Sequence, residues 1–132
     1  MQLYQLSALQ PEQFKTVNEK TMDFKKEEEE KLHLVRCYLH QHFLEELSLA
    51  KLCRVAALNE FKLKKGFKQL FGTTVFGYVK TLQMKYACRL LEEERKQVEE
   101  VAYTLGYEYP QHFSTAFKKF FGSNPSKWGR CY

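Results

Sequence analysis

A duplication inside the chain constrains its fold more than any other feature. The string FKQLFG at 67–72 returns fifty residues later as FKKFFG at 117–122. At the same offset Leu63 matches Phe113, and further upstream the offset becomes 49 while apolar positions stay in phase. Apolar positions that stay in phase over about thirty residues indicate two copies of one structural unit.

Each copy has the layout of a helix-turn-helix. Most apolar residues recur at spacings of three and four, which indicates helices, and no window shows the sustained alternation of a strand. The first copy predicts helices at 48–56 and 60–71 around a tight turn, and the second predicts helices at 97–105 and 110–121. A short helix, a tight turn and a second helix are the parts of a helix-turn-helix.

Each copy pairs a short helix with a longer one, and the two longer helices, at 60–71 and 110–121, carry residues typical of helix termini. Asn59 can cap the first helix, because its side-chain oxygen accepts from a free N–H group. Pro110 suits the first turn of the second helix, where no N–H is needed. Gly72 and Gly122 are expected to end the two helices.

Further helices flank and join the two copies. One is expected at 28–43, and a short one opens with Asn124-Pro125. Between the copies, residues 75–94 carry a helical apolar stripe that consists of Val75, Tyr78, Val79, Leu82, Tyr86 and Leu90. The expected fold is all-α, with about seven helices in two helix-turn-helix subdomains joined by a long central helix.

Charge divides the chain into an acidic arm and a basic body. Residues 1–47 carry six Lys/Arg and nine Asp/Glu, whereas residues 48–132 carry fifteen and seven. From Ser48 to Lys85, Glu60 is the single acid among eight basic residues. Such a surface attracts phosphates and points to a polyanionic partner, although solubility alone also accounts for an excess of charge.

A helix at 75–94 would be about 30 Å long, close to the roughly 34 Å of one DNA turn.

Two long strings carry a recognisable pattern: LSLAKLCRVAALNEFKLKKGFKQLFG and VEEVAYTLGYEYPQHFSTAFKKFFGSNPSKW. The second contains VA-x-x-x-GY, an aromatic residue, F-K-x-x-F-G and P-x-x-W in that order. Over about residues 30–130 the chain therefore resembles the AraC/XylS-type bacterial transcriptional regulators. The stretch KLKKGFKQLFGTTVFGY is also similar to the siderophore-responsive, pyochelin-regulator-like subgroup. The resemblance implies a homeodomain-like DNA-binding domain at 27–132, preceded by an N-terminal arm or interdomain linker at 1–26.

Two positions depart from the family pattern. Ala57 stands where the first turn commonly has glycine, which is tolerated if its backbone φ is negative. Tyr109 stands where a polar N-cap is usual, so the start of the second longer helix should be weakly capped.

The first longer helix separates into a core face and a DNA-facing candidate face. Leu63, Phe67 and Leu70 have the spacing of core residues. The candidate DNA-binding residues on this helix are Phe61, Lys64, Lys65 and Lys68. The resemblance places the first three at base-facing positions, where lysine can donate to guanine and phenylalanine can meet a thymine methyl group. The alternative is that Phe61 is core and the lysines are merely solvated.

The second longer helix offers a more neutral set of candidates. Its DNA-binding candidates are Gln111, Ser114, Thr115 and Lys118, and its core candidates are Phe113, Phe117 and Phe120. The amide of Gln111 suits adenine N6/N7, while Ser114 and Thr115 are short donors that also suit phosphate. His112 is left open. We expect this helix to contribute less specificity than the first.

Catalytic and metal sites are not expected. His33, Cys37 and His40 share one helical face, but no fourth zinc ligand is evident. Asp23 is the only aspartate, which leaves almost nothing for triad or paired-aspartate chemistry. We therefore predict no enzyme activity, no cofactor and no metal.

The four scattered cysteines favour a reducing compartment. They are Cys37, Cys53, Cys88 and Cys131, and the first three fall in expected helices, where a thiol packs as a small hydrophobe. Without a signal-peptide pattern or an apolar run of roughly 18 residues, we expect a cytoplasmic protein and no membrane contact.

The function predicted is sequence-specific binding of double-stranded DNA by two recognition helices in adjacent major-groove segments, to control transcription. RNA polymerase is a further candidate partner. We also hypothesise that the chain is the C-terminal part of a longer regulator whose ligand-sensing domain lies upstream. The alternatives are a non-specific or architectural DNA binder, and a basic protein-interaction module.

Overall fold

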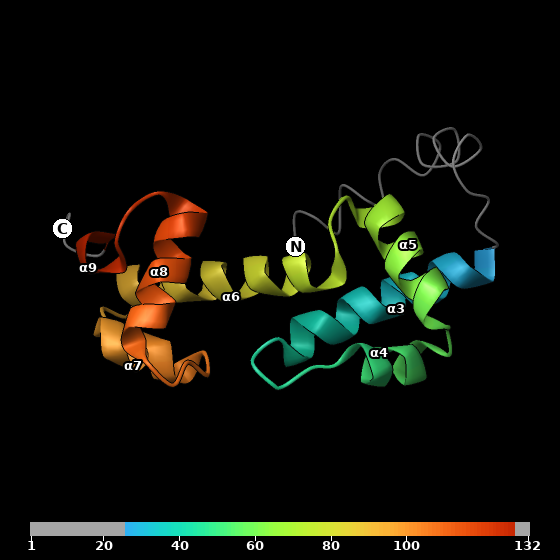
Figure 1. The fold of residues 1–132 in the computed structure, drawn as a ribbon, viewed down its shortest axis with the longest axis horizontal. Helices are drawn as coiled ribbons and strands as arrows, with labels where there is room; N and C mark the ends of the chain where they lie inside the picture. The colour runs from blue at the N-terminus through green and yellow to red at the C-terminus, as the bar shows by residue number, and fades with distance from the viewer. Residues whose placement is uncertain (1–25, 129–132) are drawn as a thin grey trace. The chain divides into compact units, whose positions relative to one another are not determined.

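The structure is a computed structural model that describes residues 26–128. Within this range it contains seven helices and no strand, as predicted for an all-α chain. The helices are α3 (Lys26–His42), α4 (Leu49–Ala56), α5 (Glu60–Phe71), α6 (Val75–Glu92), α7 (Val98–Thr104), α8 (Pro110–Phe121) and α9 (Pro125–Trp128) (Figure 1). Apart from Lys26, the predicted N-terminal arm lies outside the described residues, and so does Cys131.

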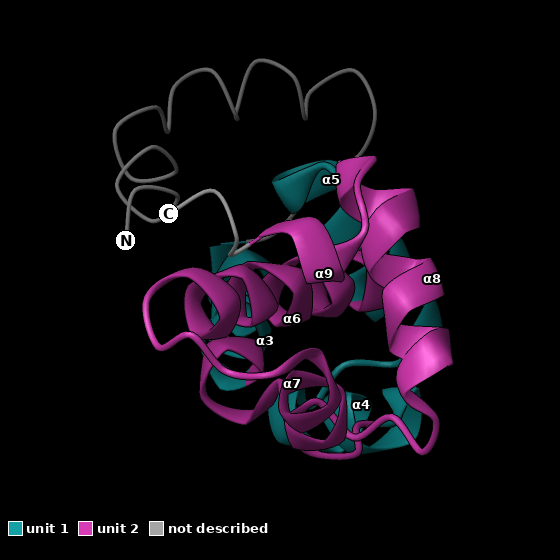
Figure 2. Ribbon diagram, turned by 90° about the vertical axis from the view of Figure 1, so that its left-hand side faces the viewer, with its two compact units in different colours: residues 1–38, 48–75 teal, residues 39–47, 76–132 magenta. Residues whose placement is uncertain are grey.

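The described residues form two compact units, and each contains one helix-turn-helix (Figure 2). Unit 1 holds the described part of α3 up to Tyr38, together with residues 48–75. Its helix-turn-helix consists of α4 and α5, which lie against α3 (Figure 1). The buried apolar side chains of unit 1 are Leu32, Val35, Leu52, Ala56, Leu58, Leu63, Phe67, Leu70 and Val75.

Unit 2 holds residues 39–47 and the rest of the chain from Phe76. Its helix-turn-helix consists of α7 and α8, which pack on the C-terminal half of α6. The core of unit 2 is formed by Met84, Ala87, Leu90, Leu91, Val101, Ala102, Leu105, Phe113 and Phe117. Met84 and Ala87 were missed by the predicted stripe of α6, whose Leu82 and Tyr86 are only half-buried.

The predicted ends of α5 and α8 are confirmed. Asn59 Oδ1 accepts a hydrogen bond of 2.8 Å from the backbone N–H of Lys62 at the start of α5. Gly72 and Gly122 end α5 and α8 with φ of 82° and 84°, a conformation that glycine adopts without a steric penalty. Tyr109 makes no side-chain hydrogen bond at the start of α8, as its lack of a suitable acceptor predicts.

The backbone φ of Ala57 is not negative, which was the condition for alanine to be tolerated in this turn. Its φ is +56°, in the left-handed region where a Cβ atom clashes with the backbone. The turn after α4 requires this conformation, because the N–H of Leu58 reaches back 3.1 Å to the carbonyl of Cys53. Ala57 is therefore strained in a position suited to glycine.

Two expectations about burial are wrong. Phe120 was expected in the core, but its side chain is 41% exposed, because the core face of α8 continues through Phe121 instead. The ring of Phe121 lies 4.7 Å from that of Phe117 and 5.0 Å from that of Trp128, measured between centroids. Cys37 was expected to pack as a small hydrophobe, but it lies on the exposed face of α3.

Candidate nucleic-acid interface

The outward face of α5 carries an exposed aromatic ring among lysines. Phe61 is 66% exposed, which excludes its alternative assignment to the core. Lys64, Lys65 and Lys68 are also exposed, while Leu63 on the opposite face is fully buried. The separation of faces predicted for this helix is therefore confirmed.

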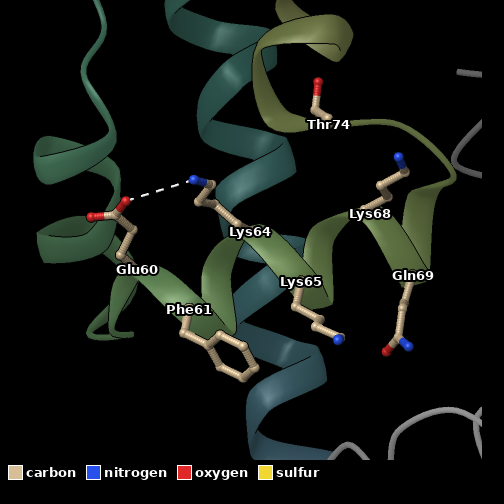
Figure 3. A pocket seen from close by; sticks show the side chains of 7 residues that line it. All are labelled: Glu60, Phe61, Lys64, Lys65, Lys68, Gln69 and Thr74. Atoms are coloured by element: carbon tan, nitrogen blue, oxygen red, sulfur yellow. Dashed lines mark ion pairs between the residues drawn. The ribbon is translucent and has the colours of Figure 1, made fainter.

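These residues surround a hollow in the surface with a volume of about 850 Å³. We call it the α5 hollow, and its lining residues are Glu60, Phe61, Lys64, Lys65, Lys68, Gln69 and Thr74 (Figure 3). Lys65 Nζ lies 5.7 Å from the centroid of the Phe61 ring, within the range of a cation–π interaction. The hollow thus combines positive charge with an apolar surface.

The outward face of α8 carries short polar side chains. Gln111, Thr115 and Lys118 are exposed and Ser114 is half-buried. The Thr115 hydroxyl donates to the backbone carbonyl of Gln111 at 2.9 Å. His112, which was left open, is also exposed.

A second hollow of about 400 Å³ lies along this face. We call it the α8 hollow, and its lining residues are Gln111, Ser114, Thr115, Lys118, Lys119 and Asn124. Two of its six lining side chains are basic, so this surface offers fewer charges than the α5 hollow.

The two hollows occupy equivalent positions in the two copies of the duplication. At the offset of 50, each lining residue of the α8 hollow has its counterpart in the α5 hollow, from Phe61 and Gln111 to Thr74 and Asn124. All eight candidates from the sequence line one hollow or the other. Contact of these side chains with DNA stays a prediction.

Sequence reasoning missed five lining residues: Glu60, Gln69, Thr74, Lys119 and Asn124. The repeat itself held the signal for four of them, since Gln69 pairs with Lys119, and Thr74 with Asn124, at the same offset. Gln69 and Lys119 lie near the ends of α5 and α8, on the faces that line the hollows. Thr74 and Asn124 follow the glycines that end these helices. For Glu60 the signal was the helical face that it shares with Lys64 and Lys68, at spacings of four, since its repeat counterpart is Pro110.

His33 and Cys88 have shifted pKa values, and neither residue lines a hollow. Burial lowers the pKa of His33, and the neighbouring charge of Arg36 lowers it further. Burial raises the pKa of the Cys88 thiol to about 11, with a further contribution from Glu92. Both shifts belong to the packing of the units rather than to the candidate interface.

The helical face with His33, Cys37 and His40 has other contacts. His33 packs edge-on against the ring of Phe71, with 5.3 Å between centroids. His40 Nε2 lies 2.7 Å from the Tyr78 hydroxyl. Across residues 26–128 no group of three or more His, Cys, Asp or Glu side chains is placed to hold a metal ion.

No helix in the described range has the length and apolar character needed to cross a membrane.

Comparison with known families gives a match over residues 52–130, to the family model described as "Helix-turn-helix domain". Among curated proteins, the chain is 31% identical over 106 residues to the "probable transcriptional regulator LumQ" of Photobacterium leiognathi. That match covers 80% of this chain and 43% of LumQ. The bifunctional transcriptional activator/DNA repair enzyme AdaA of Bacillus subtilis is 26% identical over 114 residues, which cover 86% of this chain and 52% of AdaA. The chain therefore spans about half or less of the length of these relatives.

Two solved structures that are similar to this chain share its fold. The C-terminal domain of AraT, a response regulator from Geobacillus stearothermophilus, has a TM-score of 0.71 and 27% identity, over 77% of this chain and 85% of that one. The DNA-binding domain of AdpA, a global transcriptional factor solved in complex with a target DNA, has a TM-score of 0.70 and 25% identity, over 77% and 92% of the two chains.

Proposed function

Because this chain belongs to the AraC/XylS-type family of helix-turn-helix regulators, we propose that it binds double-stranded DNA sequence-specifically and thereby controls transcription. The observation that carries this proposal is the pair of hollows at equivalent positions on α5 and α8. A helix-turn-helix places the outward face of its second helix in the major groove. Each hollow therefore suits one major-groove segment, and we propose that the two segments are adjacent on the DNA.

The α5 hollow supplies the stronger contacts. Lys64 and Lys65 can donate to guanine O6 and N7, and the exposed Phe61 ring can meet the methyl group of thymine. Lys68, near the end of the helix, is suited to a phosphate. Lysine is a flexible point charge, so its base preference is less sharp than that of arginine.

The α8 hollow supplies weaker contacts. Gln111 lies in the first turn of α8, and its amide can pair with adenine N6 and N7. Ser114, Thr115 and Lys118 follow along the same face and suit phosphates or single base contacts. We propose that this second helix adds affinity and register more than specificity.

We propose that the chain acts by binding and not by catalysis. AdaA is named as a repair enzyme as well as an activator, but the described residues that line the two hollows include no nucleophile paired with a base. The work of this domain is then done in the bacterial cytoplasm, where the chromosome lies.

Two further proposals concern the intact regulator and its partners. Since the matched relatives are about twice as long or longer, we propose that a ligand-sensing domain precedes this one in the intact regulator, and that RNA polymerase is a further partner. The similarity to the siderophore-responsive subgroup stays a prediction.

Selection from a randomised duplex library tests the proposed function. The chain is incubated with the library at near-physiological salt, and the retained duplexes are sequenced. We expect two short motifs about one helical turn apart, roughly 10–10.5 bp. Retention that collapses with salt and enriches no sequence would leave a non-specific binder. Weak retention with a shallow salt dependence would favour a protein-interaction module.

A further inference from the structure

We infer that Glu60 is a specificity-determining residue of the α5 hollow, which selects a base pair that presents the amino group of cytosine. This inference rests on the proposed DNA-binding function and assigns one of its base preferences. It gives the carboxylate a role that the lysines around it cannot fill, because a lysine only donates hydrogen bonds.

Glu60 is an isolated acid on a basic surface. It is the only Asp or Glu between Ser48 and Lys85, and it lines the α5 hollow beside Phe61 and Lys64. None of the six described residues that line the α8 hollow is acidic, and the repeat counterpart of Glu60 is Pro110. The carboxylate is therefore a feature of one recognition helix alone.

The carboxylate is held loosely and can turn towards a ligand. Glu60 Oε2 lies 3.7 Å from Lys64 Nζ, and the two side chains are 65% and 62% exposed (Figure 3). An ion pair this exposed contributes little stability, so exchanging it for contacts with bases has a small cost. Glu28 contrasts with it: its side chain is 15% exposed and lies 2.5 Å from Lys62 Nζ, as expected of an acid that holds α3 to α5.

The chemistry of the major groove makes a carboxylate selective. An ionised carboxylate accepts hydrogen bonds and cannot donate them. Cytosine presents the N4 amino donor, whereas thymine presents the O4 acceptor and guanine presents the N7 and O6 acceptors. Adenine places its N6 donor next to the N7 acceptor, so it satisfies a carboxylate only in part. Glu60 therefore favours cytosine and disfavours the other bases, and it also repels phosphates that the lysines attract without regard to sequence.

The test compares E60Q with E27Q in the library selection. Glu27 is a matched control: its exposed side chain also forms an i,i+4 pair, 3.8 Å from Lys31 Nζ in the same unit, but it does not line the hollow. Both substitutions remove one negative charge and keep the side-chain length. The wild-type chain and E27Q are expected to enrich the same motif, which includes a cytosine in the part that α5 contacts.

E60Q is expected to lose the cytosine at one position and to admit adenine there, since an amide matches adenine N6 and N7. Its preference for the original base should fall about tenfold, with the other positions unchanged. An E60Q motif identical to the wild-type motif overturns the inference, and so does the same loss in E27Q. If the wild-type chain enriches no motif, the proposed function fails first, and the assignment of Glu60 fails with it.

Discussion

Ala57 and Gly106 hold the same position in the two helix-turn-helix turns, and both have a positive φ, of 56° and 91°. In each turn the N–H of the next residue donates to the carbonyl five residues back. These bonds run from Leu58 to Cys53 at 3.1 Å and from Tyr107 to Ala102 at 3.0 Å. The duplicated sequence therefore makes the same turn twice, once with glycine and once with alanine.

Replacing Ala57 with glycine is expected to stabilise unit 1. A left-handed alanine costs about 1–2 kcal/mol, and glycine loses roughly 0.5–1 kcal/mol more in conformational entropy on folding. The net gain in the free energy of unfolding is therefore about 0.5–1 kcal/mol, which urea denaturation can measure. The reverse substitution, Gly106→Ala, should lower stability by a similar amount, since a Cβ added at this position meets open space and only the backbone resists it.

Ala50→Gly is the matched control for Ala57→Gly. Ala50 lies on the exposed side of α4, in its first turn, so glycine there should destabilise by up to about 1 kcal/mol. If Ala57→Gly destabilises the chain as Ala50→Gly does, Ala57 is not strained.

Much of the candidate interface follows from the sequence because helical periodicity decides it. The bounds of α5 and α8 were predicted to the residue, and those of α3, α4, α6 and α7 were predicted within two residues. Leu63 and Phe67 are core, and Phe61 and Lys65 are exposed, because positions three or four apart share a face.

The failures come from tertiary packing, which periodicity does not specify. Phe120 is the counterpart of the buried Leu70 but is exposed, because Trp128 packs against Phe121 at the end of α8. Arg36 is 4% exposed in unit 1, with its guanidinium 4.9 Å from the centroid of the Phe71 ring. A stacked arginine of this kind has no signature in the spacing of apolar residues.

The caps of the two recognition helices are expected to differ in strength. Asn59→Ala removes the hydrogen bond to the N–H of Lys62 and should destabilise unit 1 by about 1 kcal/mol. Tyr109→Asn introduces the missing acceptor at the start of α8 and should stabilise unit 2 by a similar amount. Thermal unfolding of the two variants checks both signs. A destabilised Tyr109→Asn would mean that the contact of Tyr109 with the His112 ring outweighs the cap.

Phe61 and Phe67 lie on opposite faces of α5 and should respond differently to truncation. Phe61→Ala removes an exposed ring, so the free energy of unfolding should change by less than about 0.5 kcal/mol. Phe67→Ala leaves a cavity in the core and should cost about 3–5 kcal/mol. Denaturation gives the stabilities, and DNA binding by Phe61→Ala should weaken while the fold is retained. Full retention of DNA affinity and of thymine preference would remove Phe61 from the interface.

Cys88 should react slowly with thiol reagents. Its pKa of about 11 lies above the ordinary thiol value, so at a pH near 8 only about one molecule in a thousand carries the reactive thiolate. Alkylation by iodoacetamide, followed by mass spectrometry of the peptides, should label the exposed Cys37 before Cys88. The labelling rate of Cys88 should keep rising as the pH approaches 11, and a plateau near pH 9 would contradict the raised pKa.

Alanine substitutions at Lys65 and Gln111 test how much each recognition helix contributes to DNA affinity. Both are exposed, so substitution by alanine should leave the unfolding midpoint unchanged. On a site obtained by selection, Lys65→Ala is expected to weaken binding by about 1–3 kcal/mol, because it loses a charged contact in the more basic hollow. Gln111→Ala should cost less, about 1 kcal/mol, since the α8 hollow contributes mainly neutral contacts. Fluorescence anisotropy measures both effects, and Lys65→Ala should also relax the preference for guanine at the position that this lysine contacts. A larger loss for Gln111→Ala would reverse the assignment and make α8 the principal reader of sequence.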